Sequence, residues 1–274
     1  MSKTDPNLTG VPETMLWTIH NRALEARRPD GYLRDPETLR IYDALDYDFE
    51  RSFGRAEGSH AVRAAEIDRV LRAWLERHPD GQVVSLGEGL ETTAYRVDNG
   101  RVRWLSVDLP EAIRVREVFL APTERFRHLA ASATDPAWMD RVDPSRGVFV
   151  VAEGLFMYLR PDEVREIVAG VAARFPGAET MFDVVPRWFS KRTVAGVWRT
   201  KHYKLPAMPF GMDLPEIEPT LRSWTPAVES VEIVPYCFSR GLLGLLFRLL
   251  VAIPPIRRRW PTLVHVRFRG RLVE

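Results

Sequence analysis

Cysteine is nearly absent from this chain, because Cys237 is the only one among 274 residues. A single cysteine excludes an intramolecular disulfide framework and a cysteine metal cluster. The first ten residues read MSKTDPNLTG and lack the apolar core of a secretory signal peptide. We therefore expect a cytoplasmic protein, and we expect no metal.

An excess of one charge is also missing. Lysine and arginine number 39 against 37 acidic residues, which gives a formal net charge of +2. Because no stripe of lysine and arginine stands out, we expect no nucleic-acid partner. The hydrophobic share of 45% is that of an ordinary globular protein, and the length suits one α/β domain with appended helices and a lid. These numbers leave the oligomeric state open.

No segment combines the length and the apolar character of a membrane-spanning helix. The most apolar stretch, residues 241–256, reads GLLGLLFRLLVAIPPI; it is too short to span a bilayer, contains Arg248 and ends at two prolines. We interpret it as a buried or lid helix. The alternative is an interfacial helix followed by the basic residues 257–259, which would give membrane contact through residues 241–259.

Three stretches with helical spacing precede the first expected strand. They cover Glu13 to Arg28, Pro36 to Phe49 and Ala61 to Leu75. The sequence His-Pro-Asp-Gly at residues 78–81 is then a strong signal for the end of a helix. We expect residues 1–80 to form a helical cap outside the sheet.

Strands alternate with helices from residue 82 onward, which is typical of a parallel sheet with right-handed crossovers. Five strands are expected, at Gln82–Leu86, Arg103–Val107, Phe126–Ala131, Val148–Ala152 and Glu179–Val184, with an amphipathic helix at Pro161–Arg174. Two late strands, Val231–Tyr236 and Leu263–Phe268, would close the sheet. The sequence thus predicts an α/β fold with a doubly wound, mostly parallel seven-stranded sheet. Its core would span residues 81–186, and its C-terminal strands, with the apolar helix, residues 229–274.

The segment between these two groups of strands, residues 187–228, has a different composition. Arg187 to Pro226 are rich in aromatics, prolines and cations. We expect a lid or substrate insertion here. Its aromatic residues could wall an apolar pocket or form the core of the lid itself: Trp188, Phe189, Trp198, Tyr203 and Phe210.

A glycine turn follows the first strand in VVSLGEGLETTAYR, residues 83–96. Gly87 and Gly89 have no Cβ, so the backbone there can approach a ligand closely. A dinucleotide fingerprint would place a third glycine at position 92, but this chain has Thr92, so the loop lacks the pyrophosphate signature. A nucleoside without phosphates fits better; the alternative is a structural turn without a ligand.

Two carboxylates follow later strands at the same edge of the sheet. Asp108 lies about 20 residues after the glycine turn, where an acid can accept hydrogen bonds from ribose hydroxyls; it could instead cap the helix that begins at Pro110. Glu153 follows the strand Val148–Ala152, where it could meet an ammonium group or pair with a lid arginine.

Four motifs, in their order and spacing, resemble the leucine carboxyl methyltransferase family, including its bacterial branch that acts on polyketides and other small molecules. They are HAVRAAEIDRVL, LGEGLETTAYR, VDLP and AEGLFMYL, and the resemblance runs from Thr18 to Asp183. It implies a class I methyltransferase sheet with N-terminal helices and an inserted lid. It also implies S-adenosylmethionine as cofactor and S-adenosylhomocysteine as its product.

The resemblance assigns roles to individual residues. It implies that Arg63 meets the cofactor carboxylate and that Gly87 and Gly89 line the methionine portion. It implies that Asp108 holds the ribose and that Glu153 lies by the methionyl end. The alternative for Arg63 is an ordinary solvated helix arginine.

Two departures from the family pattern affect the expected site. The family commonly has Asp-Leu-Arg-Asp after the third strand, whereas this chain has SATD, so Ser132 and Ala133 would meet the adenine without charge assistance. Glu91 stands where the family has aspartate, which leaves an acid at a helix start. Arg22, in HNRALEARRPDG, is a second expected contact of the cofactor carboxylate.

Methyl transfer from a sulfonium is an in-line displacement, so the protein mainly has to align the acceptor oxygen and exclude water. A carboxylate acceptor needs no base, whereas a phenol or alcohol does. The catalytic candidates are cations and a tyrosine of the lid: Arg187, Arg192, His202, Tyr203 and Lys204.

These observations predict an S-adenosylmethionine-dependent O-methyltransferase. Its expected acceptor is a carboxyl or hydroxyl oxygen of a small molecule, such as a polyketide or another secondary metabolite. Two alternatives are methylation of a protein C-terminal carboxylate and non-catalytic binding by a protein of the same fold.

Overall fold

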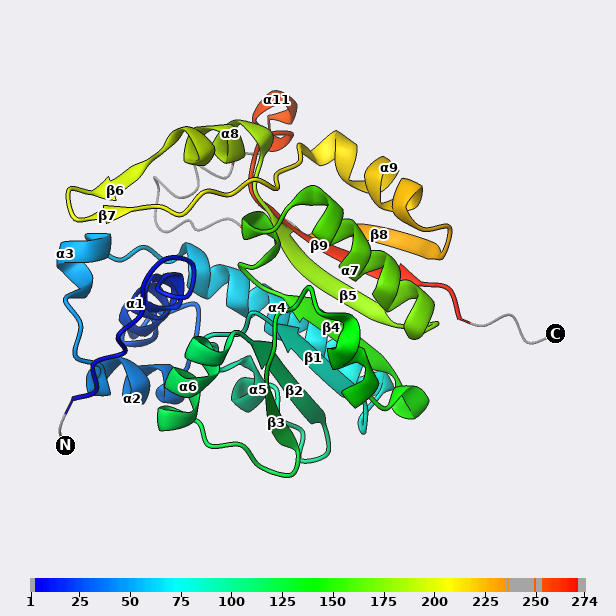
Figure 1. The fold of residues 1–274 in the computed structure, drawn as a ribbon, viewed down its shortest axis with the longest axis horizontal. Coiled ribbons are helices and arrows are strands. Elements are labelled where there is room, and N and C mark those ends of the chain that lie inside the picture. The colour runs from blue at the N-terminus through cyan, green and yellow to red at the C-terminus, as the bar shows by residue number, and fades with distance from the viewer. Residues whose placement is uncertain (1–2, 235, 237–248, 250–252, 271–274) are drawn as a thin grey trace.

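A seven-stranded sheet runs through the middle of the molecule, with helices on both faces (Figure 1). The computed structural model describes residues 3–234, 236, 249 and 253–270. The strand order is β3-β2-β1-β4-β5-β9-β8. The strands are β1 (Gln82–Leu86), β2 (Arg103–Asp108), β3 (Phe126–Ala130), β4 (Val148–Ala152), β5 (Glu179–Val184), β8 (Val228–Val234) and β9 (Thr262–Phe268).

The first five strands are parallel, and β9 lies antiparallel between β5 and β8. The predicted doubly wound, mostly parallel seven-stranded sheet is confirmed. The order reverses at β1, where the chain first builds outward through β2 and β3 and then returns to form β4 on the other side. Such a reversal opens a crevice at the carboxyl ends of the strands.

The central strand β4 shows why this sequence forms a sheet covered on both faces. All five of its residues are apolar and buried. Successive side chains point to opposite faces of a strand. Val150 and Ala152 accordingly pack in one core cluster with α7 (Pro161–Arg174), whereas Phe149 and Val151 pack in another with α4 (Ser59–Arg77).

The remaining helices surround this sheet. They are α1 (Thr14–Ala26), α2 (Pro36–Ala44), α3 (Phe49–Phe53), α5 (Thr93–Arg96), α6 (Pro110–Phe119), α8 (Arg187–Ala195), α9 (Leu214–Trp224) and α11 (Pro254–Arg257), with short 3-10 turns at Pro136–Arg141, Pro144–Arg146 and Phe156–Tyr158. Figure 1 shows α1, α2 and α3 grouped beside the sheet, with the hairpin of β6 (Trp198–Thr200) and β7 (Tyr203–Lys204) above α3.

The prediction of one helix over Pro36–Phe49 is wrong. Leu45 has an extended backbone and ends α2, and a new helix starts after Asp48. The Asp48 carboxylate accepts a hydrogen bond from the Arg51 backbone N–H at 3.0 Å, which caps α3. The run of apolar and charged residues therefore concealed a helix break.

The predicted start of the late strand at Val231 is also wrong, because β8 begins at Val228. This strand lies at the edge of the sheet, and its exposed Glu229 interrupts the apolar pattern without ending the strand. Charged residues are common on edge strands, where they discourage pairing with another chain.

The second half of the segment expected to form a lid, Arg187–Pro226, packs against the sheet. Ile217 and Leu221 of α9 have no exposed surface and belong to the largest core cluster, together with Phe210. Helix α9 therefore covers the sheet beside α7, as Figure 1 shows. In the first half, the β6–β7 hairpin lies above α3 and α8 lies beside α11 (Figure 1).

The apolar stretch 241–256 falls mostly outside the described residues, so neither interpretation of it is tested. No helix in the described part of the chain has the length and apolar character to cross a membrane. The four expected segments, 1–80, 81–186, 187–228 and 229–274, stay a prediction.

Candidate functional site

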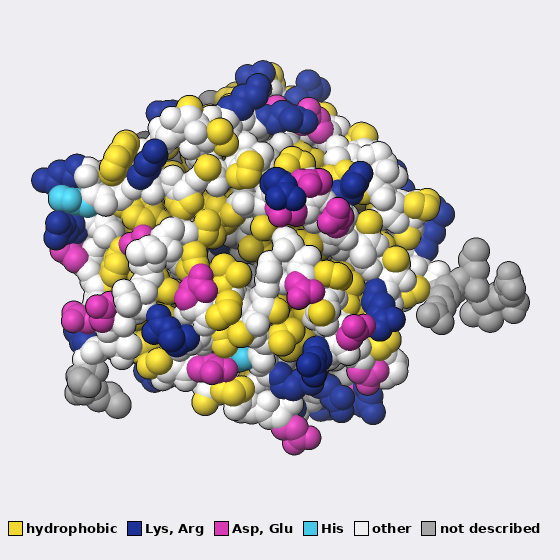
Figure 2. Space-filling view, viewed as in Figure 1, with side chains coloured by type: hydrophobic (Ala, Val, Ile, Leu, Met, Phe, Trp, Pro, Cys, Tyr) yellow, Lys and Arg dark blue, Asp and Glu magenta, His cyan; other side chains and the backbone are white. Residues whose placement is uncertain are grey.

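A cavity of about 250 Å³ lies at the carboxyl ends of β1, β2 and β4, under α1. We call it the strand-end cavity. Its lining includes every cofactor-binding residue expected from the sequence: Arg22, Arg63, Gly87, Gly89, Asp108, Ser132, Ala133 and Glu153. Figure 2 shows a hollow ringed by hydrophobic side chains near the middle of this face of the molecule. Residues from four strand ends and two helices thus converge on one place.

The two glycines of the turn after β1 are required by their backbone and by close neighbours. Gly87 and Gly89 have φ angles of +63° and +51°, which L side chains rarely adopt. A Cβ at Gly87 would lie 2.8 Å from Leu155 Cδ1, and one at Gly89 would lie 2.8 Å from Met15 Cβ. The absent side chains keep this floor of the cavity open.

Asp108 at the end of β2 holds the glycine turn in place. Its Oδ2 accepts a hydrogen bond from the Gly89 backbone N–H at 2.7 Å, and its Oδ1 accepts one from the Leu109 N–H at 2.8 Å. Burial raises the pKa of Asp108. Each carboxylate oxygen can accept more than one hydrogen bond, so Asp108 can support the loop and still receive hydroxyls of a ligand.

Glu153 at the end of β4 pairs with a helix arginine, not with a lid arginine. Arg63 of α4 donates from Nε to Glu153 Oε1 at 2.8 Å and from Nη1 to Asp183 Oδ2 at 2.7 Å. The Gly154 backbone N–H donates to Asp183 Oδ1 at 2.6 Å. Arg63 therefore joins α4 to the ends of β4 and β5 and is not an ordinary solvated arginine.

The second carboxylate oxygen of Glu153, Oε2, is buried and has no hydrogen-bond partner among the described residues. The side chain is only 8% exposed. Burial raises the pKa of Glu153 to about 7, although the charge of Arg63 opposes this. A buried acceptor without a partner is costly, so this atom is suited to receive a hydrogen-bond donor from a ligand.

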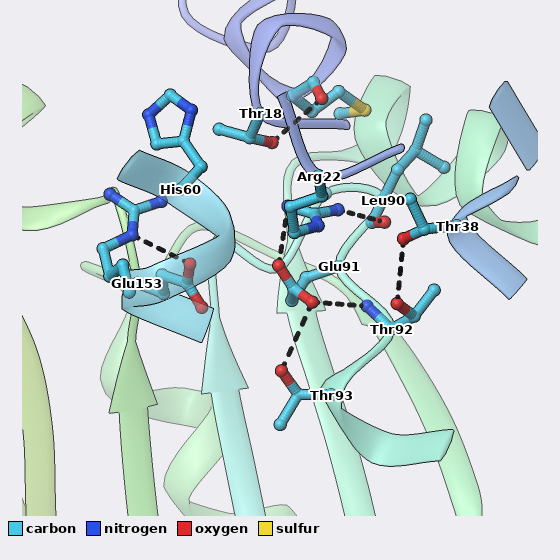
Figure 3. Close-up of polar contacts among 12 residues, drawn as sticks. Thr18, Arg22, Thr38, His60, Leu90, Glu91, Thr92, Thr93 and Glu153 are labelled. Carbon is cyan, nitrogen blue, oxygen red and sulfur yellow. Dashed lines mark hydrogen bonds and ion pairs between the residues drawn. The ribbon is translucent and has the colours of Figure 1, made fainter. Parts of the chain in front are cut away.

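Arg22 of α1 reaches the other side of the same cavity (Figure 3). It donates from Nη2 to the Leu90 carbonyl at 2.9 Å, and its Nη1 lies 2.6 Å from Glu91 Oε2. Glu91 is buried, yet the guanidinium groups of Arg22 and Arg96 hold its pKa at about 2. The Nε of Arg22 is buried without a partner in the described chain.

Ser132 and Ala133, after β3, also line the cavity. The Ser132 hydroxyl lies 2.8 Å from the Thr134 hydroxyl and accepts a 3.2 Å hydrogen bond from the Thr134 backbone N–H. Both contacts lie within one turn of the chain. The uncharged wall expected from SATD is therefore present, and no carboxylate of that motif is among the cavity's lining residues.

A second cavity of about 470 Å³ adjoins the first, and we call it the aromatic cavity. The two cavities share five lining residues: Thr14, Thr18, Arg63, Gly154 and Tyr158. The second is walled by rings from distant parts of the chain: Trp17, Tyr158, Trp188, Phe189, Tyr236 and Trp260. Burial raises the pKa of Tyr158 to about 12, so its hydroxyl stays neutral.

The expected catalytic residues of the lid do not line either of these two cavities as the described residues define them. Arg187, Arg192, His202 and Lys204 are exposed, and Arg187 donates to Glu216 at 2.6 Å. Tyr203 is buried against Phe53, with ring centroids 4.8 Å apart. Of the five lid aromatics, Trp188 and Phe189 line the aromatic cavity, whereas Trp198 is 62% exposed.

The residues of the aromatic cavity that sequence reasoning missed include Trp17 of α1 and His60 of α4. His60 precedes Arg63 by three positions, so the two lie on the same side of the helix. Once Arg63 is assigned to the site, this spacing indicates that His60 lies near the site as well. Nothing in the sequence near Trp17 marked it as different from the other apolar residues of α1.

The arrangement can bring two ligands next to each other, because the two cavities share lining residues. One ligand would lie on the glycine floor between Asp108 and Glu153, and the other among the aromatic rings. Groups of three or more histidine, cysteine, aspartate or glutamate side chains suited to hold a metal ion do not occur among the described residues.

Known proteins resemble this chain both in sequence and in fold. A family model described as leucine carboxyl methyltransferase matches residues 15–172. The tetracenomycin polyketide synthesis O-methyltransferase TcmP of Streptomyces glaucescens is 36% identical over 184 residues, which cover 66% of this chain and 68% of that protein. The S-adenosyl-L-methionine-dependent methyltransferase dpfgK of Gibberella zeae is 28% identical over 194 residues, covering 64% of this chain and 65% of that protein.

A solved structure shares the fold at low sequence identity. The crystal structure of the CurJ carbon methyltransferase matches with a TM-score of 0.51 and 11% identity, and the match covers 94% of this chain and 68% of that one.

Proposed function

Because the chain belongs to the leucine carboxyl methyltransferase family and is a S-adenosylmethionine-dependent methyltransferase, we propose that it methylates an oxygen of a small aromatic molecule. The cofactor follows from the family. The acceptor is the part that needs an argument from the two cavities. A cytoplasmic site of action, expected from the single cysteine, belongs to the same proposal.

The residues of the strand-end cavity fit the cofactor. Its ammonium group would satisfy the buried Oε2 of Glu153, and its ribose hydroxyls would donate to Asp108. Gly87 and Gly89 leave the floor without side chains where the methionine portion would lie. Arg22 and Arg63 have N–H groups left over for a carboxylate, since a guanidinium carries five. When bound, the cofactor supplies an electrophilic methyl group.

The shared wall between the two cavities is the observation on which the proposal depends. Thr18, Arg63 and Tyr158 line both spaces, so a molecule in the aromatic cavity would lie next to a molecule in the strand-end cavity. Methyl transfer needs such alignment, because the acceptor oxygen must approach the methyl group in line with the bond that breaks. The surrounding side chains would also exclude water.

The aromatic wall supports a planar, largely apolar acceptor. Trp17 and Trp188 are far apart in the sequence but line the same cavity. Tryptophan rings bury large flat surfaces. TcmP acts in tetracenomycin polyketide synthesis, as its name states, which favours a polyketide-like aromatic for this chain. Methylation of a protein C-terminus is the competing function.

Labelled methyl transfer tests the proposal. The purified protein, S-adenosylmethionine labelled in the methyl group and an extract of the organism that carries the gene would be incubated, and the label followed by mass spectrometry. We expect label in a small aromatic compound, as an ester or ether. Label in protein would favour the C-terminal alternative, and no transferred label at all would contradict the proposal. Gly89→Val, which fills the floor of the strand-end cavity, is the inactive control.

A further inference from the structure

His60 is held at the start of α4 by a hydrogen bond whose direction can be assigned. The Glu57 backbone N–H donates to Oδ1 of Asn21 at 3.2 Å, which identifies that atom as the amide oxygen. The other amide atom, Nδ2 of Asn21, then lies 2.8 Å from Nδ1 of His60. Asn21 is buried, with 1% of its surface exposed, so this orientation is well constrained.

The orientation of Asn21 fixes the tautomer of His60. An amide Nδ2 is only a donor, so Nδ1 of His60 has to accept and carries no proton. The proton of the neutral ring is then on Nε2. A charged ring would place an N–H against the amide N–H2, and burial together with the nearby Arg63 and Arg22 lowers the pKa of His60 well below its usual value. The ring is therefore neutral, with Nε2–H as its donor.

This donor is available to a ligand. His60 lines the aromatic cavity, and no hydrogen bond from its Nε2 to another described residue is present. The ring packs edge-on against Trp17, with centroids 5.2 Å apart, which restricts its rotation. Figure 3 shows His60 above the strand ends, on the side of Glu153 and away from Arg22.

We infer that His60 binds and positions the acceptor, by donating a hydrogen bond from Nε2 to an acceptor oxygen in the aromatic cavity, and that it is not a general base. This inference rests on the proposed function, because it needs the aromatic cavity to be the acceptor site. The acceptor is then an aromatic compound with an oxygen that receives a hydrogen bond, such as a carboxylate, a phenolate or a carbonyl beside the methylated position. Asn21 acts through His60 as a positioning residue.

Long-range ¹H–¹⁵N spectra of the ¹⁵N-labelled protein test the tautomer without any substrate. The chain has six histidines, and His60→Gln identifies the signals of His60 by their loss. We expect an unprotonated Nδ1 and a protonated Nε2 at pH 7. A protonated Nδ1 would overturn the inference. In Asn21→Asp the carboxylate accepts from Nδ1, so Nδ1 should become protonated.

Turnover measurements test the role, with the organic extract of the organism as acceptor source and calorimetry of S-adenosylhomocysteine as the binding control. His60→Ala removes the donor, so methyl transfer at low extract concentration should fall about tenfold while the Kd for S-adenosylhomocysteine stays within twofold. His60→Gln keeps an N–H near the place of Nε2 and should retain most of the activity. Melting temperatures of both variants exclude a folding defect.

Three other outcomes are distinguishable. If His60→Gln is as inactive as His60→Ala, a hydrogen-bond donor at this position is not sufficient and the inference is wrong. If His60→Ala is as active as the unmodified protein, His60 has no role in acceptor binding. If the unmodified protein binds S-adenosylhomocysteine but methylates nothing in the extract, the proposed function itself is contradicted, whatever tautomer the spectra show.

Discussion

Arg63 Nε donates to Glu153 Oε1 at 2.8 Å, so the arginine and the acid expected to meet opposite ends of one amino-acid moiety are already paired with each other. Arg63 also bonds Asp183 at 2.7 Å. Only one oxygen of Glu153 is used in this pairing, because Oε2 remains without a partner. The ion pair with Arg63 therefore leaves one oxygen of Glu153 free to bind an ammonium group.

Cofactor affinity should rise with pH because of Glu153. Its pKa is raised to about 7, so the free protein holds a proton there below pH 7, and binding of an ammonium group has to release it. We expect S-adenosylhomocysteine to bind roughly tenfold more weakly at pH 6 than well above pH 7. Titration calorimetry between pH 5.5 and 8.5 measures this, and buffers of different ionisation enthalpy would report the released proton.

The control for this prediction is Glu153→Gln, in which the side chain keeps its shape but no longer binds or releases a proton. The affinity of this variant for S-adenosylhomocysteine should be weak and nearly independent of pH over the same range. Equal pH dependence in the variant and the unmodified protein would show that another group titrates.

The glycine floor should be intolerant of even one methyl group. Gly89 and Gly100 both have positive φ angles, +51° and +80°, but a Cβ at Gly89 meets Met15 at 2.8 Å whereas one at Gly100 meets nothing within 4 Å. Gly100→Ala should cost only the backbone strain, about 1 kcal/mol of unfolding free energy. Gly89→Ala should cost more and also lower cofactor affinity, as measured by urea unfolding and calorimetry. Equal effects would mean that the contact with Met15 relaxes freely.

The sheet and its strand-end residues were predictable because they depend on local patterns. The apolar run of β4 predicts a buried strand, and the glycines after β1 predict a tight turn, each from a few adjacent residues. Parallel strands then bring their carboxyl ends to one edge of the sheet. Because the residues expected to bind the cofactor follow these strands, they lie around one cavity. Glu91 and Ser132, which depart from the family pattern, still line it.

The acceptor side was not predictable in the same way. The wall of the aromatic cavity combines Trp17, Trp188 and Trp260, which are far apart in sequence, and their convergence depends on the tertiary packing of α1 and α8. Composition could not separate Trp188, which lines the cavity, from Trp198, which is exposed. Composition also could not show that Phe210 belongs to the core of the sheet, because aromatic residues occur both in lids and in cores.

Asp108 should contribute to both cofactor binding and the fold. Because its carboxylate receives the N–H groups of Gly89 and Leu109, Asp108→Ala leaves two donors without a partner and should lower the melting temperature as well as the affinity. Asp108→Asn keeps one acceptor oxygen and should be the milder change in stability, with about tenfold weaker cofactor binding. Calorimetry and thermal unfolding of the apo protein separate the two effects. A fully stable Asp108→Ala would mean that the loop does not depend on this carboxylate.

Glu91 should support the fold at neutral pH and lose that role in acid. Its pKa is lowered to about 2, below that of an unfolded glutamate, so its contribution is present above roughly pH 4.5 and is lost as the pH falls toward 2. Glu91→Gln leaves Arg22 without its buried counter-charge, whereas Arg96 keeps Asp35 and Asp68, and the substitution should cost about 3 kcal/mol at pH 7. Urea unfolding at pH 7, 5 and 3.5 should show this difference narrowing below pH 4.5. A constant difference would point to lost packing instead of lost charge.

Trp188 and Trp198 offer a matched test of the acceptor site, since both are exposed tryptophans of the same segment but only Trp188 lines the aromatic cavity. If the acceptor binds among these rings, Trp188→Ala should raise the KM for the acceptor about tenfold through lost ring contact, with the KM for S-adenosylmethionine unchanged. Trp198→Ala, 62% exposed, should leave both constants as they are. Steady-state kinetics with the acceptor from the labelling experiment measures these values. Equal effects of the two substitutions would indicate a general disturbance of the segment, and no effect of Trp188→Ala would move the acceptor away from this wall.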